Sequence, residues 1–207
     1  MSSEQVLTIL QTHVPQPSVE YCFKLWRTSP FELKITRSRQ TKVGDFTSRG
    51  TKNHPRITLN NDLNAYLFLV TYIHEVAHLR VYLQFGSRVD PHGDKWKTTF
   101  TDLMIPMLWE SVFPEEILHE LRRHMINPRA SSFADTVLTE AFRKFDQGQH
   151  QIVLSQVPEG SIFKLHGRYF RKGKLKRTRV LCKELQSKRD YLVPADSLVT
   201  DVQLSLL

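Results

Sequence analysis

The start of the chain predicts two short amphipathic helices. Apolar side chains recur at helical spacing between residues 4 and 13, and Pro15 ends this segment. A second helix is expected from Pro17, because proline fits a first helical turn, where its missing N–H has no partner to lose. One face of that helix carries the apolar residues Val19, Cys22, Phe23 and Trp26.

The pattern then changes to the alternation of a β-sheet. Phe31–Ile35 alternates apolar and polar side chains and predicts a half-buried strand. A second strand is expected near Lys42–Arg49, after polar turn residues, and Arg56–Asn60 predicts a third. We expect these two or three short strands to form an antiparallel sheet ahead of the next helix.

The next predicted helix is the longest. Its apolar residues repeat every three or four positions, at Leu63, Tyr66, Leu67, Val70, Ile73, Ala77 and Val81. Asn61 or Asp62 is expected to cap its N-terminus, and Gly86 is expected to end it. Four polar or charged residues between positions 74 and 80 interrupt the apolar surface, so we expect burial in protein and not in lipid.

Two more helices complete the first region. They are expected over residues 94–106, where Pro106 kinks or ends the helix, and over residues 114–125, where Pro114 suits the first turn. With the strands, these helices predict an α+β domain covering residues 1–130.

Beyond this domain the pattern predicts a helix followed by a β-rich region, residues 131–207. Asn127–Ser131 is the best candidate for the boundary, and Ser132 with Asp135 predicts the capped start of a helix that reaches Gly148. Short strands are then expected near residues 151–155, 161–171, 175–184 and 190–194.

The positive charge of the chain is concentrated in this C-terminal region. The net charge is +8, from 29 basic and 21 acidic residues. Between Ser161 and Arg189 lie 11 of the basic residues and a single acidic one, Glu184. The rest of the chain, with 18 basic and 20 acidic residues, is slightly acidic. Such an asymmetry points to an anionic partner for the C-terminal segment.

The two cysteines, Cys22 and Cys182, exclude a disulfide framework and a four-cysteine zinc ribbon. Two reduced thiols are typical of an intracellular protein. Residues 1–10 lack the basic and long apolar regions of a signal peptide. We therefore expect a cytoplasmic protein without a membrane partner, and nothing in the sequence predicts an oligomeric state.

His74-Glu75-Val76-Ala77-His78 lies in the middle of the longest predicted helix. Residues four apart share one face of a helix, so both imidazoles can approach one ion, and zinc binds such nitrogens at roughly 2.0–2.1 Å. Glu75 can act beside the ion as a general base for an attacking water. The motif predicts peptide hydrolysis. The competing hypothesis is a pair of hydrogen-bonded histidines next to a solvated glutamate.

The third ligand has several candidates. Val81 and Gln84 stand where the metzincin motif requires glycine and histidine, so that motif is excluded. A glutamate from a later helix (Glu110, Glu115 or Glu116) could serve instead. His92 is the better candidate, because the loop after Gly86 can turn back and bring it to the ion.

The combination of His74-Glu75-x-x-His78 with His92-Gly93-x-x-Trp96-Lys97 resembles the SprT-like, Spartan-related zinc metallopeptidase family, over roughly residues 17–126. Val43-Gly44-Asp45-Phe46 and Ile57-Thr-Leu-Asn60 are similar to strand segments of that family. The resemblance implies a minigluzincin-like core with a short antiparallel sheet, one Zn²⁺ on His74, His78 and His92, and proteolysis of DNA-associated proteins. Some relatives end in a four-cysteine zinc ribbon, and this chain departs from them there.

The basic C-terminal segment interleaves cations with aromatic residues. Cations neutralise phosphates and exposed aromatics stack on bases, whereas buried aromatics would form a small core under a solvated basic face. We expect most aromatics to be buried and the cations to be exposed. No motif for sequence-specific recognition occurs, so we expect non-sequence-specific DNA contacts. The residues expected to make them are Lys164, Arg168, Arg171, Lys172, Lys174, Lys176, Arg177 and Arg179.

These features predict a zinc endopeptidase that acts on DNA-associated or DNA-crosslinked proteins. The alternative is a nucleic-acid-binding protein whose zinc site is structural or vestigial. A third hypothesis is a peptidase whose basic segment binds RNA, ribosomes or acidic protein.

Overall fold

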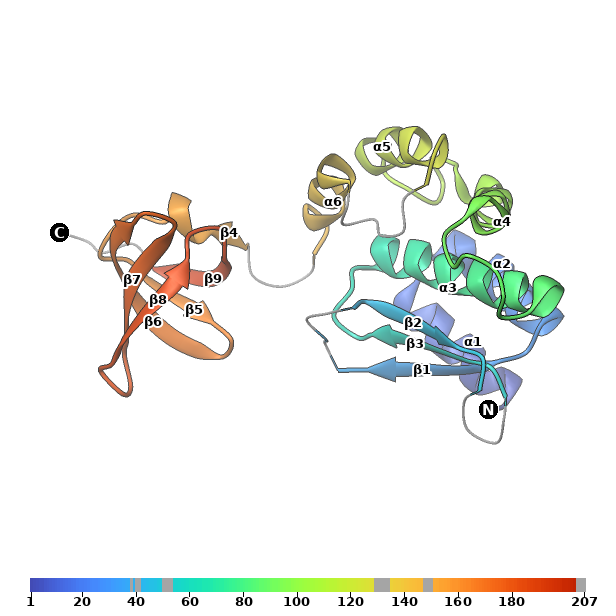
Figure 1. Ribbon diagram of the computed structural model, residues 1–207, viewed down its shortest axis with the longest axis horizontal. Coiled ribbons are helices and arrows are strands. Elements are labelled where there is room, and N and C mark those ends of the chain that lie inside the picture. The colour runs from blue at the N-terminus through green and yellow to red at the C-terminus, as the bar shows by residue number, and fades with distance from the viewer. Residues whose placement is uncertain (38, 40–41, 50–53, 129–134, 147–150, 204–207) are drawn as a thin grey trace. The chain divides into compact units, whose positions relative to one another are not determined.

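The computed structural model describes residues 1–37, 39, 42–49, 54–128, 135–146 and 151–203. The chain divides into two compact units, Met1–Phe145 and Asp146–Leu207 (Figure 1). Each unit has its own hydrophobic core. The predicted α+β class is confirmed, since helices occur together with two separate sheets.

The sheet of the first unit has three strands, in the order β1 (Glu32–Thr36), β3 (Arg56–Asn60) and β2 (Gly44–Thr47). β3 pairs antiparallel with β2 but parallel with β1. The prediction of an antiparallel sheet is therefore wrong for β1. A strand alternates apolar and polar side chains equally in both directions, so the pattern carried no information on its direction.

Helix α3 (Ala65–Phe85) contains the HExxH sequence and packs between the sheet and α4 (Figure 1). Its N-terminal cap is Asn64, whose side chain accepts a hydrogen bond from the Leu67 N–H at 3.0 Å. The prediction of Asn61 or Asp62 as the cap is wrong, because both lie in the turn that leaves β3. Gly86 ends the helix as predicted, with a φ of 73° that suits glycine.

The other helices of the first unit agree with the sequence pattern, except that the last one ends at Arg143, before the expected end at Gly148. They are α1 (Ser3–His13), α2 (Val19–Thr28), α4 (Asp94–Met104), α5 (Glu115–Met125) and α6 (Thr136–Arg143), with short 3₁₀ turns at η1 (Gln16–Ser18) and η3 (Ile105–Met107). Within the described part of the chain, none of the helices combines the length and the hydrophobicity that a membrane span requires.

Helix α6 belongs to the first unit. Leu138, Ala141 and Phe142 are buried in its core, and the Asn64 side chain donates to the Phe142 carbonyl at 2.9 Å. The division of the chain therefore falls after Phe145, later than the boundary expected at Asn127–Ser131. Asp135 caps α6, while Ser132, expected to begin this helix, lies outside the described residues.

The second unit is an antiparallel sheet of six strands in the order β4–β9–β5–β6–β7–β8. The strands are β4 (Ile152–Val153), β5 (Ile162–Leu165), β6 (Arg168–Lys176), β7 (Arg179–Glu184), β8 (Asp190–Pro194) and β9 (Leu198–Gln203), with a 3₁₀ turn at η5 (Leu154–Gln156). The single strand expected over residues 161–171 is two strands. His166 and Gly167, with φ of 49° and 78°, form a tight turn between them.

Candidate metal centre

Three histidine side chains of the first unit converge on one point. The Nε2 atom of His78 lies 3.1 Å from that of His74 and 3.1 Å from that of His92. One ring nitrogen from each histidine lies within 4.8 Å of the other two. His74 and His78 come from successive turns of α3, and His92 comes from the loop between α3 and α4. The structure thus brings together the three residues predicted as ligands.

The spacing of these nitrogens suits a tetrahedral metal ion. Ligands at 2.0–2.1 Å from a tetrahedral centre are about 3.3 Å apart, close to the separations from His78. Among the described residues, the histidines form the group that could hold a metal. Glu110, Glu115 and Glu116 are exposed and are not part of it, which favours His92 over a glutamate as third ligand.

The imidazoles are held in the neutral form that binds metals. Burial, and then the neighbouring His78, His92 and His124, lower the pKa of His74 to about 3. Burial and then His92 lower the pKa of His78 to about 4. Burial also lowers the pKa of His92, against the charge of Asp90, which acts in the opposite direction. A metal ion therefore has little competition from protons at neutral pH.

The loop that carries His92 is fixed by Asp90. Its carboxylate accepts from the His92 backbone N–H at 3.2 Å, and its carbonyl accepts from the Gly93 N–H at 3.2 Å. Gly93 is the N-cap residue of α4. The start of α4 therefore positions the third histidine. This explains why His92 lies so close in the sequence to Trp96, which is a residue of α4.

Trp96 packs against all three rings of the histidine cluster. Its ring is fully buried, with centroids 4.6, 5.3 and 4.8 Å from those of His74, His78 and His92. Phe100 stacks behind it at 4.9 Å. Rigid aromatic packing holds the imidazoles where the ion would bind. Trp96 is the aromatic residue of the HG-x-x-W element. The sequence therefore marked this residue, but its packing role could not be assigned from the sequence alone.

Glu75 lies beside the ligands and is 6% exposed. Burial, and then the charge of Asp45, raise its pKa to about 8 overall. A hydrogen bond from the Phe46 backbone N–H and the cations Arg39 and Lys42 act in the opposite direction. A bound metal cation would also favour the carboxylate form. The surroundings thus raise the proton affinity of this side chain, and its carboxylate form could act as a general base beside a bound metal.

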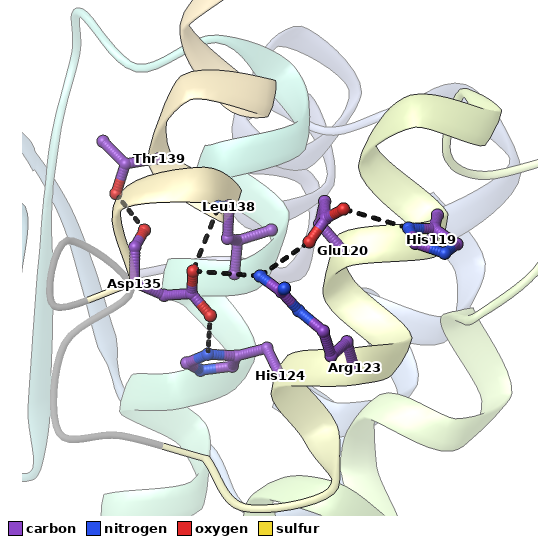
Figure 2. A network of polar contacts seen from close by, with 7 residues as sticks. All are labelled: His119, Glu120, Arg123, His124, Asp135, Leu138 and Thr139. Carbon is purple, nitrogen blue, oxygen red and sulfur yellow. Dashed lines mark hydrogen bonds and ion pairs between the residues drawn. The ribbon is translucent and has the colours of Figure 1, made fainter.

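Helices α5 and α6 are joined by a polar network (Figure 2). Asp135 accepts from the Leu138 N–H at 3.2 Å, and its other carboxylate oxygen lies 3.4 Å from Nδ1 of buried His124. Arg123 bridges Glu120, at 2.8 Å, and Asp135, at 3.6 Å. His119 is exposed next to Glu120, so His119 and His124 form no common site.

The cations predicted to contact nucleic acid lie on β5, β6, β7 and the turn between β6 and β7, and all but two of them are exposed. Lys164 is half-buried, and its ammonium lies over the Tyr169 ring. The guanidinium of Arg168 lies over the rings of Phe170 and Tyr191. The expectation of an exposed cation is wrong for Lys172. This side chain is 8% exposed, and its ammonium donates to the carbonyls of Ser155 and Val157.

The aromatic residues of this unit are mostly internal. Phe163 and Phe170 are buried in its core and stack on each other, and Tyr191 is half-buried. Tyr169 is 40% exposed. Burial of the two phenylalanines agrees with the expectation of a small aromatic core beneath exposed cations.

Comparison with known proteins agrees with the histidine geometry. The SprT-like family profile matches residues 19–121, a range that includes the sheet, the HExxH sequence and His92. No curated protein and no solved structure matches the chain significantly. The matched range lies wholly in the unit that contains the three histidines. Through this unit, the chain belongs to the SprT-like family.

Proposed function

We propose that the chain is a zinc-dependent endopeptidase that acts on DNA-associated or DNA-crosslinked proteins. The observation that carries the peptidase is the convergence of the His74, His78 and His92 nitrogens beside buried Glu75. Zinc bound there would polarise the scissile carbonyl and lower the pKa of the attacking water to about 7. Glu75 takes a proton from that water and later gives it to the leaving nitrogen.

The substrate is proposed to bind in extended form along β2. The middle strand β3, which ends at Asn60, is paired on both sides and offers no free edge. β2 is an edge strand that packs against α3, and an extended peptide can add to such an edge through backbone hydrogen bonds. A short sheet over an HExxH helix supports the minigluzincin-like arrangement.

The peptidase is tested with one variant of the proposed base, one variant of a proposed ligand and one control. Glu75→Gln should retain zinc and lose cleavage of casein or histone, whereas His92→Ala should lose zinc. Glu116→Gln removes an exposed glutamate of the same unit and should change neither. Zinc per chain is measured by elemental analysis and cleavage by gel. Cleavage by Glu75→Gln at the wild-type rate would refute the mechanism.

DNA recruitment is proposed for one face of the second unit, which we term the basic face: Arg171, Lys176, Arg179 and Lys183. All four side chains are exposed. The register of β6 and β7 places Arg171 opposite Lys183 and Lys176 opposite Arg179. Like charges opposite each other destabilise a sheet, so neither pair serves the stability of this unit. Asp190, opposite Lys183 on β8, offsets one of the charges.

A phosphate backbone would remove the repulsion within both pairs. Arg171→Gln with Lys183→Gln should weaken DNA binding and reduce the dependence of log affinity on log salt by roughly 1.8, at about 0.9 per phosphate contact. The matched control, Lys24→Gln with Lys34→Gln, removes two exposed cations of the first unit. Equal salt slopes for the two double variants would refute this role of the basic face.

Cleavage assays with and without DNA separate the main proposal from its alternatives. DNA binding without cleavage under any condition would favour a nucleic-acid-binding protein with a structural or vestigial zinc site. A salt-insensitive interaction with DNA would favour a peptidase recruited to another partner.

A further inference from the structure

The edge strand β2 lies directly against the general base. A Cβ atom added at Gly44 would fall 2.6 Å from Oε1 of Glu75 and 2.6 Å from Cγ2 of Thr71, closer than real Cβ atoms approach. Thr71 is buried on α3, and its hydroxyl donates to the Leu67 carbonyl at 2.7 Å. Thr71 is therefore held in place, so a side chain at Gly44 would displace the Glu75 carboxylate.

Glycine is required at this position by space and not by backbone conformation. Gly44 is not among the positive-φ glycines of the described chain, which are Gly86, Gly160 and Gly167. Any other residue could adopt its backbone angles as an extended strand residue. A residue with a Cβ atom would not fit at this position while the strand lies this close to α3.

The close approach of β2 allows a backbone contact to Glu75. The Asn60 N–H donates to the Val43 carbonyl, and the register pairs Asp45 with Thr58, so the alternation of an antiparallel ladder turns the N–H groups of Gly44 and Phe46 away from β3. The Phe46 N–H donates instead to the carboxylate of Glu75.

We propose that Gly44 is a positioning residue for Glu75. Its missing side chain lets β2 approach α3 closely enough for the Phe46 N–H to hold the carboxylate in one place. This inference rests on the proposed function, in which Glu75 is the general base. A glutamate otherwise has several rotatable bonds, and a displacement of about 1 Å at a reacting group can lower a rate about 100-fold.

This role is separable from metal binding. His74 contacts Trp96 and Phe100 of α4, and His78 contacts Trp96, whereas Glu75 faces β2. A change at Gly44 therefore acts on the base and leaves the packing around the ligands intact. Thr47 provides a matched control in the same strand, since its side chain projects to the opposite face from Gly44 and Phe46.

The experiment compares Gly44→Ala and Thr47→Ala in the full-length protein. Gly44→Ala should keep wild-type zinc content while kcat falls about 100-fold and KM changes much less. Amide hydrogen exchange, resolved by residue with NMR, should become at least tenfold faster at Phe46 in Gly44→Ala and also in Glu75→Ala. Thr47→Ala should change none of these quantities substantially. Glu75→Ala probes the same contact with the strand sequence intact.

Three results decide the inference. Unchanged kcat and unchanged Phe46 exchange in Gly44→Ala would overturn it. Recovery of kcat in Gly44→Ala with Thr71→Ser would also overturn it, because the loss would then come from the Thr71 methyl group. If the wild-type protein cleaves nothing while Phe46 exchange responds as expected, the positioning contact stands and the proposed peptidase function fails.

Discussion

Acidification should destabilise the metal-free first unit through its buried histidines. Burial lowers the pKa of His74 to about 3 in the folded chain, against an ordinary value of 6.5. Below pH 6.5 the unfolded chain therefore binds a proton that the folded chain does not. The stability is fully present above pH 6.5 and is lost as the pH falls towards 3. Between pH 7 and pH 5, His74 alone should lower the free energy of unfolding by about 2 kcal/mol. His78 acts in the same direction.

Tryptophan fluorescence can follow this unit alone. Trp26, Trp96 and Trp109 are the three tryptophans of the chain, and all lie within Met1–Phe145. Guanidinium titrations in the presence of a chelator, at pH 7, 6 and 5, give the free energy of unfolding at each pH.

A variant without the His74 imidazole isolates its contribution. His74→Gln should have a shallower pH dependence than the wild type, by about 2 kcal/mol between pH 7 and pH 5. His54→Gln removes an exposed histidine of the same unit and should follow the wild type. Identical pH dependence of wild type and His74→Gln would refute the conclusion that the folded protein holds this imidazole neutral.

Three further substitutions test the scaffold. Asn64→Ala removes the α3 cap and the bond to α6, and should lower the free energy of unfolding by about 2 kcal/mol, whereas Asn61→Ala should change it by less than about 0.5. Trp96→Ala should weaken zinc binding by about 10–100-fold in a competition titration, and the exposed Trp109→Ala should not. Asp135→Ala should cost about 1–2 kcal/mol at pH 7 in guanidinium titrations. Although burial raises the Asp135 pKa, hydrogen bonds from Leu138 and His124 lower it overall, so this loss should shrink as the pH falls through that lowered value.

The convergence of the three histidines was predictable from the sequence because local rules determine most of their geometry. The helical repeat puts His74 and His78 on one face of α3 whatever the rest of the fold. The position of His92 depends on a loop, and was predictable only through its link to Trp96 in the HG-x-x-W element. Gly44 could not be assigned a role, because its contact with Glu75 depends on where an edge strand crosses a helix much later in the chain.

The remaining differences also come from non-local packing. The direction of β1 relative to β3 depends on how the chain crosses between them. Lys172 was expected outside, since lysine is rarely buried, but two backbone carbonyls in the second unit accept from its ammonium. A short run of alternating apolar and polar residues predicts neither the direction of a strand nor the burial of a lysine.

The burial of α3 has a consequence for metal exchange. The residues around its histidines, including Tyr72, Ile73, Val76 and Ala77, are fully buried among apolar side chains. Packing of the core of the first unit, and not binding of an ion, therefore offsets the conformational entropy lost when two of the three histidines are ordered. In zinc fingers, by contrast, the ion itself drives folding. We therefore expect that an ion bound here could leave and return without refolding of the unit, and that different divalent ions could be exchanged into one intact scaffold.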